Sequence, residues 1–409
     1  MKLTDQEKRM LDGECGEGVR YSMDILVQLG ELYGAESFVE IQNVHGAMSY
    51  PNFWASVELV ESFSNKGAKF SVPTTLNTAA WTGNFNRWAP ELPECAEHIE
   101  RCQRMIDAVK KMGAHLTCSC TPYFQGNLPR FGECVAWTES SAISFANSVI
   151  GARANRITDG IDKAAGVAGR IPRFGLMLDE NRKANALVHV EYKPKNFSEY
   201  GTIGWIVGKK LGNQIPVIEG LPESATTSDL MHFGGAGASS GGLPLYHCVG
   251  LTPEAPTREY ALGGKKPLYE LRIGAKEVAE ATAEIGSAKT DEFQAVLLGC
   301  PHPTLPEVRR LGELLAGRRV KRGLKFWIFI SPDVLALSRE FGYAQAIEAS
   351  GAELVERTCV LFFDITKWGW KTIMTDSAKY ANLLTSDPTW LETIFRDTPG
   401  CVDAATEKK

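Results

Sequence analysis

Apolar residues recur at helical spacing between Thr4 and Tyr33, which predicts a helical segment at the amino terminus. Thr4, followed by Glu7 three residues later, has the arrangement of a capping box at the start of this segment. Farther along, the pattern predicts strands at 37–46, 68–77 and 114–123, separated by helices at 54–67 and 96–113. A repeated order of strand, loop and helix is typical of a mostly parallel sheet with helices on both faces.

The pattern changes after residue 150, where glycine and proline become frequent. The glycine-dense segment 233–244 predicts a flexible loop that faces a ligand or a partner, and a charged helix is expected at 275–286. Strand candidates return at 294–308, 324–332, 354–362 and 371–379, with helices at 307–318 and 333–351. We therefore expect an α/β unit over 1–150, a glycine-rich middle unit over 151–288, and an α/β unit over 289–409 that closes with a capping tail and a frayed end.

The composition is that of an ordinary globular chain, because 44% of the 409 residues are hydrophobic and 23% are charged. The formal net charge of −5 lacks the basic excess typical of nucleic-acid or membrane-surface binding, so we expect neither as a partner. A small anionic substrate would have to be bound by a local site. The amino terminus has no signal-peptide core and no apolar run is long enough to span a membrane, which indicates a cytoplasmic protein.

Ten cysteines are dispersed along the chain. In a reducing compartment this favours buried thiols or metal ligands over disulfides. Cys120, Cys300 and Cys359 lie beside predicted strands, and proline closely follows the first two. A proline after a thiolate fixes the backbone and suits a rigid ligand loop. By spacing alone, a shared metal site and scattered core thiols both remain open.

Ligands of open parallel sheets bind outside the carboxyl ends of the strands, and polar residues are expected there. Each of these residues also has a structural alternative, as a cap, a core hydrogen bond or a solvated loop charge. Among them, the guanidinium of Arg182 could bind an anion in two places, with Lys183 as a point charge beside it. The candidates at predicted strand ends are His45, Ser49, Thr74, Thr75, Asn77, His302, Ser377 and Lys379. Further polar candidates are Glu139, Ser140 and Asn147 in a stretch with helical periodicity, and Arg182 and Lys183 in a polar run.

Five segments, in the same order and spread over nearly the whole chain, resemble the aconitase X family of the aconitase superfamily. They are SVPTTLN (71–77), the long segment from CTPY to GARANR (120–156), RFGLMLDENRKA (173–184), LLGCPHPTLPEV (297–308) and TDSAK (375–379). The resemblance implies a multi-domain aconitase-like α/β fold and an iron-sulfur cluster held by Cys120, Cys300 and Cys359, with Cys118 as a neighbouring thiol. It suggests that Glu139 and Ser140 line the substrate pocket. We predict catalytic roles for these two residues and for His302, and expect the other polar candidates to bind the substrate.

The family occurs as one fused chain or as large and small subunits, and this chain ends soon after TDSAK, so it resembles the large subunit. The implied partner is the small swivelling subunit, which would supply a catalytic serine. The implied reaction is loss of water from a small hydroxy acid, either mevalonate 5-phosphate, giving an anhydromevalonate phosphate, or cis-3-hydroxy-L-proline. Segment 233–242 lacks the GK[ST] ending of a phosphate loop, which argues against nucleotide binding. A non-catalytic α/β protein that binds a metal or a small molecule is the alternative from another class.

Overall fold

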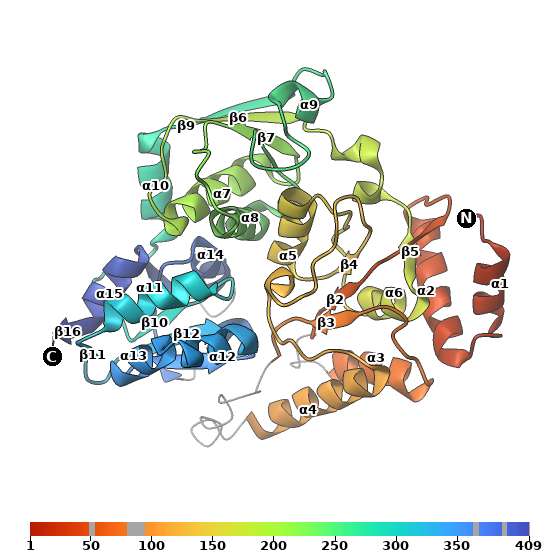
Figure 1. Ribbon diagram of the computed structural model, residues 1–409, viewed down its shortest axis with the longest axis horizontal. Helices are drawn as coiled ribbons and strands as arrows, with labels where there is room; N and C mark the ends of the chain where they lie inside the picture. Colours follow the sequence, from red (N-terminus) through yellow and green to blue (C-terminus); the bar gives the residue numbers. More distant parts are fainter. Residues whose placement is uncertain (49–53, 80–94, 363–367, 387–390, 409) are drawn as a thin grey trace. The chain divides into compact units, whose positions relative to one another are not determined.

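The computed structural model describes residues 1–48, 54–79, 95–362, 368–386 and 391–408 (Figure 1). These residues form two compact units, which are described separately. Unit 1 comprises the described residues up to Lys183, and unit 2 comprises the described residues from Ala184 onward. Within the described ranges, none of the helices combines the length and apolarity that a membrane crossing requires.

The amino-terminal segment of unit 1 forms two helices, α1 (Asp5–Asp12) and α2 (Glu17–Leu32), where the apolar periodicity predicted one. The predicted capping box is confirmed: the Thr4 side chain accepts from the Glu7 amide, and the Glu7 carboxylate accepts from the Thr4 amide. The break follows from Gly13 and Gly16, whose φ angles of 90° and 99° lie where glycine is favoured. A continuous apolar pattern therefore spans a sharp turn.

The main sheet of unit 1 is parallel, with strand order β3-β2-β4. Its strands are β2 (Val44–Gly46), β3 (Thr74–Leu76) and β4 (Ala136–Trp137). The predicted strand at 37–46 is in fact two strands, because β1 (Phe38–Glu40) pairs antiparallel with β5 (Arg170–Pro172) in a separate sheet. The strand predicted at 114–123 is wrong: only His115 bridges to Thr75, and Cys118 has a φ of 46°, which ends extended structure.

Helices cover this sheet as the sequence predicted for α3 (Trp54–Asn65) and α4 (Cys95–Met112). The apolar core beneath β2 is closed by α2 and by α6 (Ile161–Ala168), through residues such as Met23 and Ala165. The other elements of unit 1 are the 3-10 turns η2 (Pro122–Phe124), η4 (Gly175–Met177) and η5 (Asp179–Arg182), the helix α5 (Ser140–Phe145) and the π-helical turn η3 (Ala146–Ile150).

The first sheet of unit 2 is parallel, with order β8-β7-β6-β9. Its strands are β6 (Ala186–Val190), β7 (Pro216–Glu219), β8 (His247–Cys248) and β9 (Tyr269–Ile273). Its helices are α7 (Phe197–Leu211), α8 (Thr227–Gly241), α9 (Arg258–Leu262) and α10 (Ala275–Ile285), the last as predicted.

The prediction of a flexible loop at 233–244 is wrong, because most of this segment is the carboxyl-terminal part of α8. Its glycines lie where α8 packs closely on α7. A Cβ atom at Gly204 would lie 2.0 Å from the carbonyl oxygen of Phe233, and one at Gly241 would lie 1.8 Å from that of Gly208. The glycines thus permit contact between two buried helices rather than flexibility.

The second sheet of unit 2 has five parallel strands in the order β13-β12-β10-β14-β15. They are β10 (Ala295–Leu298), β12 (Lys325–Ile330), β13 (Glu353–Glu356), β14 (Thr372–Thr375) and β15 (Glu392–Phe395). An apolar core on one face joins this sheet to α11 (Leu305–Leu315), α13 (Tyr343–Ala349) and α15 (Thr398–Ala405). Its remaining elements are α12 (Pro332–Glu340), η6 (Val360–Phe362) and α14 (Ala378–Ser386).

The tail expected to cap the last unit contributes regular structure. β15 extends the five-stranded sheet, and β16 (Thr406–Lys408) pairs antiparallel with β11 (Arg318–Val320), so the expected frayed end is wrong for these residues. Short strands with polar faces carry little periodic signal, which explains the error. Mostly parallel sheets flanked by helices confirm the predicted fold class.

Candidate active site

The carboxyl edge of the five-stranded sheet collects the predicted site residues of unit 2. From β10 the chain adds β12 and β13 on one side and then returns to add β14 and β15 on the other. The order therefore reverses between β10 and β14, where open parallel sheets bind ligands. Cys300 and His302 follow β10, and Ser377 and Lys379 follow β14, so all four lie at this reversal.

Hydrogen bonds connect these residues with the segment after β13. The Ser377 hydroxyl donates to the Cys300 carbonyl oxygen and accepts from the Tyr380 amide at 3.1 Å. The Tyr380 hydroxyl in turn lies 3.6 Å from the Cys359 sulfur. The His302 Nε2 lies 3.1 Å from the Thr358 carbonyl oxygen. The structure thus brings Cys300, His302, Ser377 and Cys359 into one network, as the strand-end rule predicted.

The members of this network differ in how deeply they are buried. Cys300 and His302 are 5% and 1% exposed, and Ser377 and Lys379 are also buried, whereas Cys359 is half-buried. Because a carbonyl oxygen can only accept a hydrogen bond, the His302 ring must carry its proton on Nε2. In the neutral ring this makes Nδ1 the acceptor nitrogen.

A second buried network beside this edge was not foreseen from the sequence. His232 of α8 lies 2.9 Å from Glu307 of α11, which also accepts from Ser228. Burial alone would raise the pKa of Glu307, but the hydrogen bond with His232 and the other donors outweigh it and lower the pKa. The only sequence signal was the pair Thr304 and Glu307, which forms a capping box at the start of α11.

Asp376, between β14 and Ser377, is part of the same surroundings. Burial raises its pKa to about 6, although the Thr398 hydroxyl donates to its Oδ2 at 2.7 Å and opposes the shift. The nearby charge of His232 lowers the pKa of Asp376 and that of Glu307 raises it. A carboxyl group with a raised pKa of about 6 therefore lies between β14 and Ser377.

The parallel sheet of unit 1 reverses its order between β2 and β4, and His45 of β2 lies at this point. Its Nδ1 is 3.0 Å from the Thr75 hydroxyl, which accepts from the Asn127 side chain at 2.7 Å. The pKa of His45 is lowered to about 4. Burial is the main cause and the charge of Lys163 adds to it, whereas Glu139 and a backbone hydrogen bond with Ser119 act in the opposite direction. His45 is therefore neutral at physiological pH.

The predicted residues Thr74, on β3, and Asn77, just after it, form hydrogen bonds with the backbone of unit 1. The Thr74 hydroxyl donates to the Val72 carbonyl oxygen, and the Asn77 amide donates to Gly46. The Asn77 Oδ1 is buried and has no hydrogen-bond partner within the ranges that the structure describes. Ser49, predicted to bind substrate, lies outside these ranges.

Glu139 and Ser140 lie at the amino terminus of α5. The Glu139 carboxylate caps this helix by accepting from the Ala142 amide at 2.5 Å and from the Ser141 hydroxyl at 2.6 Å. Ser140 is the first residue of the helix and is half-buried. A structural role for Glu139 is thus evident, and the catalytic roles of both residues stay predictions.

The segment Gly175–Met177 forms a 3-10 turn that begins at Gly175, whose φ is 56°. The turn leads to Arg182, which is 2% exposed and donates to the side chain and the carbonyl oxygen of Asn147 and to the Leu176 carbonyl oxygen. Asn147 also bonds both backbone groups of Ala154. Lys183, by contrast, is exposed.

The third predicted ligand, Cys120, is buried in unit 1 just before η2, with Cys118 buried two residues earlier. Cys300 and Cys359 belong to unit 2. Within the described ranges, no three His, Cys, Asp or Glu side chains are grouped closely enough to hold a metal ion. The shared cluster thus stays a prediction.

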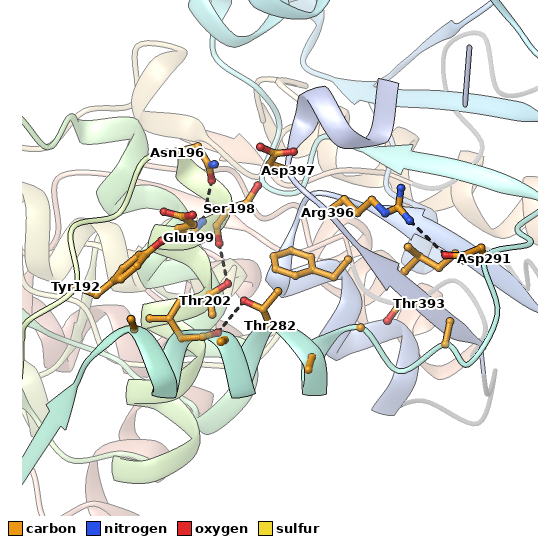
Figure 2. Close-up of a pocket in the computed structure, with 18 of the residues that line it drawn as sticks. Tyr192, Asn196, Ser198, Glu199, Thr202, Thr282, Asp291, Thr393, Arg396 and Asp397 are labelled. Carbon is orange, nitrogen blue, oxygen red and sulfur yellow. Dashed lines mark hydrogen bonds and ion pairs between the residues drawn. The ribbon is translucent and has the colours of Figure 1, made fainter. Parts of the chain in front are cut away.

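A pocket of about 610 Å³ lies within unit 2 between the first turn of α7, the helix α10 and the end of β15 (Figure 2). Arg396 contacts Asp291 on one side of it, and Glu199 and Asp397 add further carboxylates. The residues that line it include none of the predicted site residues.

Comparison with known proteins covers almost the whole chain. The family models of the aconitase X first, second and third domains match residues 1–180, 184–283 and 293–407. The phosphomevalonate dehydratase large subunit of Methanocaldococcus jannaschii is 36% identical over 94% of this chain and 96% of its own, and that of Thermococcus kodakarensis is 38% identical over 93% and 94%.

Two further matches complete this picture. The cis-3-hydroxy-L-proline dehydratase of Pseudomonas aeruginosa is 35% identical over 99% of this chain and 70% of its own. The crystal structure of Thermococcus kodakaraensis aconitase X in its holo form superposes with a TM-score of 0.87 at 34% identity, over 99% of this chain and 100% of that one. This chain therefore belongs to the aconitase X family.

Proposed function

We propose that this chain is the large subunit of a phosphomevalonate dehydratase, a hydro-lyase that removes water from mevalonate 5-phosphate to give an anhydromevalonate phosphate. The observation that carries the proposal is the identity of 36% and 38% to two large subunits of that name over more than nine tenths of each chain. We place the protein in the cytoplasm, because ten cysteines dispersed along a large chain are typical of a reducing compartment.

The cofactor that we propose is an iron-sulfur cluster held by Cys120, Cys300 and Cys359. The donor set fits, because thiolates are the ligands such clusters take and two of these thiols share one sheet edge. When bound, a cluster with three protein thiolates supplies an open iron position, a Lewis acid for the leaving hydroxyl group.

In this proposal some residues hold the cluster ligands in place, and others bind or orient the substrate. The Ser377 hydroxyl fixes the backbone at Cys300 by donating to its carbonyl oxygen. The Nε2 of His302 is held by the Thr358 carbonyl oxygen, so the Nδ1 acceptor points away from Thr358. Lys379, near the start of α14, and the exposed Lys183 are the cations that we assign to the anionic substrate. The buried guanidinium of Arg182 positions Asn147.

Besides departure of the hydroxyl group, loss of water requires a group that takes a proton from a carbon atom of the substrate. We assign this to the predicted residues Glu139 and Ser140, with His45, Ser49, Thr74, Thr75 and Asn77 around the substrate. A neutral His45 suits a hydrogen-bonding role, because its lowered pKa keeps the ring uncharged. A small subunit, the partner implied by the names of the relatives, would supply a further serine.

The second candidate reaction is dehydration of cis-3-hydroxy-L-proline, favoured by the 35% identity to the Pseudomonas aeruginosa enzyme. Co-expression with a small subunit, anaerobic purification and dehydration assays on both substrates separate the two. Turnover of mevalonate 5-phosphate with a kcat/KM at least tenfold above that for the proline supports the proposal. The reverse preference would replace it, and zinc or no metal in place of iron and sulfide would remove the proposed cofactor.

A further inference from the structure

The chain leaves β2 through Ala47, and a buried ion pair holds both backbone groups of this residue. Asp162 and Lys163, in the first turn of α6, are 0% and 1% exposed. The Asp162 Oδ2 accepts from the Ala47 amide at 2.9 Å, and the Lys163 ammonium donates to the Ala47 carbonyl oxygen. The two charges also contact each other, with Nζ 3.0 Å from Oδ2.

Further contacts fix both charges. The Asp162 Oδ1 accepts from the amides of Gly160 and Lys163, and Asp159 forms a second ion pair with the ammonium. Burial alone would lower the pKa of Lys163, but the two carboxylates outweigh it and raise the pKa. A side chain at Gly46 would meet Asp162 at 3.0 Å, so the strand end fits closely against the pair.

Stability alone is a poor reason for this arrangement. Removing two charges from water costs several kcal/mol per ion, and apolar residues of similar size often stabilise a core as well or better. What an ion pair can do, and apolar packing cannot, is fix the direction of one amide and one carbonyl group. Here these two groups lie two residues beyond His45, at the order reversal of the sheet.

We propose that Asp162 and Lys163 are positioning residues for the dehydratase reaction, which fix the segment Gly46–Met48 and thereby the orientation of His45 toward the substrate. This inference rests on the proposed function. Neither residue belongs to the predicted site, and the signal in the sequence is faint: two adjacent charges that open the otherwise small and apolar helix IDKAAGVA.

The test uses the complex of this chain with its small subunit and the variants Lys163→Met, Asp162→Ala and Lys163→Arg. We expect Lys163→Met and Asp162→Ala to raise KM for mevalonate 5-phosphate at least about tenfold while kcat changes less than about threefold, since a misplaced binding group weakens substrate binding. Lys163→Arg, which keeps the charge and the donors, should recover most of the loss.

The matched control is Glu7→Gln, which breaks the buried ion pair of Glu7 with Arg170 in the same unit. It should lower stability and leave kcat and KM unchanged. A spectroscopic readout accompanies the kinetics: because the charge of Lys163 lowers the pKa of His45, Lys163→Met should raise the pKa measured by NMR on labelled histidine, and Glu7→Gln should not.

An active wild-type complex with unchanged KM in both Lys163→Met and Asp162→Ala overturns the inference and leaves the proposed function intact. If Lys163→Met does not fold, Asp162→Ala decides the matter by the same criteria. A wild-type complex without activity on either substrate overturns the proposed function itself, and the positioning role for that reaction with it.

Discussion

The carboxyl edges of the two parallel sheets hold their polar groups in different ways. In unit 2, the edge of the five-stranded sheet joins thiols, a hydroxyl and an imidazole through neutral hydrogen bonds, such as Ser377 to Cys300 and His302 to Thr358. In unit 1, the edge around His45 is held by buried charges, Asp162 and Lys163. We therefore propose that unit 2 contributes two of the three cysteine ligands, Cys300 and Cys359, whereas unit 1 contributes Cys120 and the charges that orient the segment around His45.

The largest expected effect, on activity, should follow when a proposed metal ligand of unit 2 is removed. Cys300→Ser should lower kcat/KM on the order of 10³-fold, because the Lewis acid is lost with the cluster. Iron and sulfide analysis together with the dehydration assay checks this. Cys401→Ser, a buried thiol in the apolar core of the same unit, is the control and should keep its iron. Full iron and activity in Cys300→Ser would remove Cys300 from the ligand set.

The next effect concerns the pH dependence of unit 1. The pKa of His45 falls from 6.5 to about 4 on folding, so its contribution to stability is present above pH 6.5 and is lost as the pH falls toward 4. This amounts to about 3 kcal/mol at the limit. In His45→Gln, urea denaturation at pH 7 and pH 4.5 should show a smaller difference than in the wild type.

Two comparisons control this measurement. The exposed His115 is replaced by Gln in a parallel variant, which should keep the wild-type difference. Asp162 and Asp376, whose pKa values are raised to about 6, act with the opposite sign, since their contribution is lost as the pH rises from 3.8 to 6. An unchanged pH dependence in His45→Gln would mean that the imidazole is protonated in the folded chain.

A smaller effect should follow from the hydroxyl that supports Cys300. Ser377→Ala removes the donor to the Cys300 carbonyl oxygen and the acceptor for the Tyr380 amide. Loss of a supporting contact of this kind typically lowers metal affinity or activity 10- to 100-fold. Iron retention under chelator and kcat/KM are the measurements. Ser338→Ala, which removes a buried hydroxyl within α12, should change neither one.

The smallest effect on stability concerns the helix cap in unit 1. Glu139→Gln keeps an oxygen for the Ala142 amide, so the free energy of unfolding should change by less than about 1 kcal/mol. Because the charge of Glu139 raises the pKa of His45, the variant should lower that pKa further, as NMR would show. Dehydratase activity equal to that of the wild type would reject Glu139 as a catalytic group and leave it as the cap.

Much of this molecule was predictable from its sequence. The family, the fold class and the hydro-lyase class followed from the segments around Cys120, Cys300 and TDSAK, and the comparisons confirm all three. The capping box at Thr4 and Glu7 was predictable because both partners lie within one turn of chain. The strand-end rule brought Ser377 to Cys300 across 77 residues, since parallel strands share an edge.

What was missed depends on contacts that no local pattern contains. The glycines of α8 predict a loop when α8 is considered alone, and only the approach of α7 makes them helical. Lys163 is 116 residues from Ala47, and nothing in the apolar periodicity marks that contact.

The contact between α7 and α8 also restricts how this protein can evolve. Gly204 faces the Phe233 carbonyl, and Gly208 faces Gly241, each closer than a methyl group allows. A lineage that gains a side chain at one of these positions has to separate the two helices, and α8 carries His232 toward Glu307. Related proteins should therefore keep all these glycines or replace several of them together. Joint replacement at the contact between α7 and α8 would indicate a relative in which the position of His232 beside Glu307 has changed.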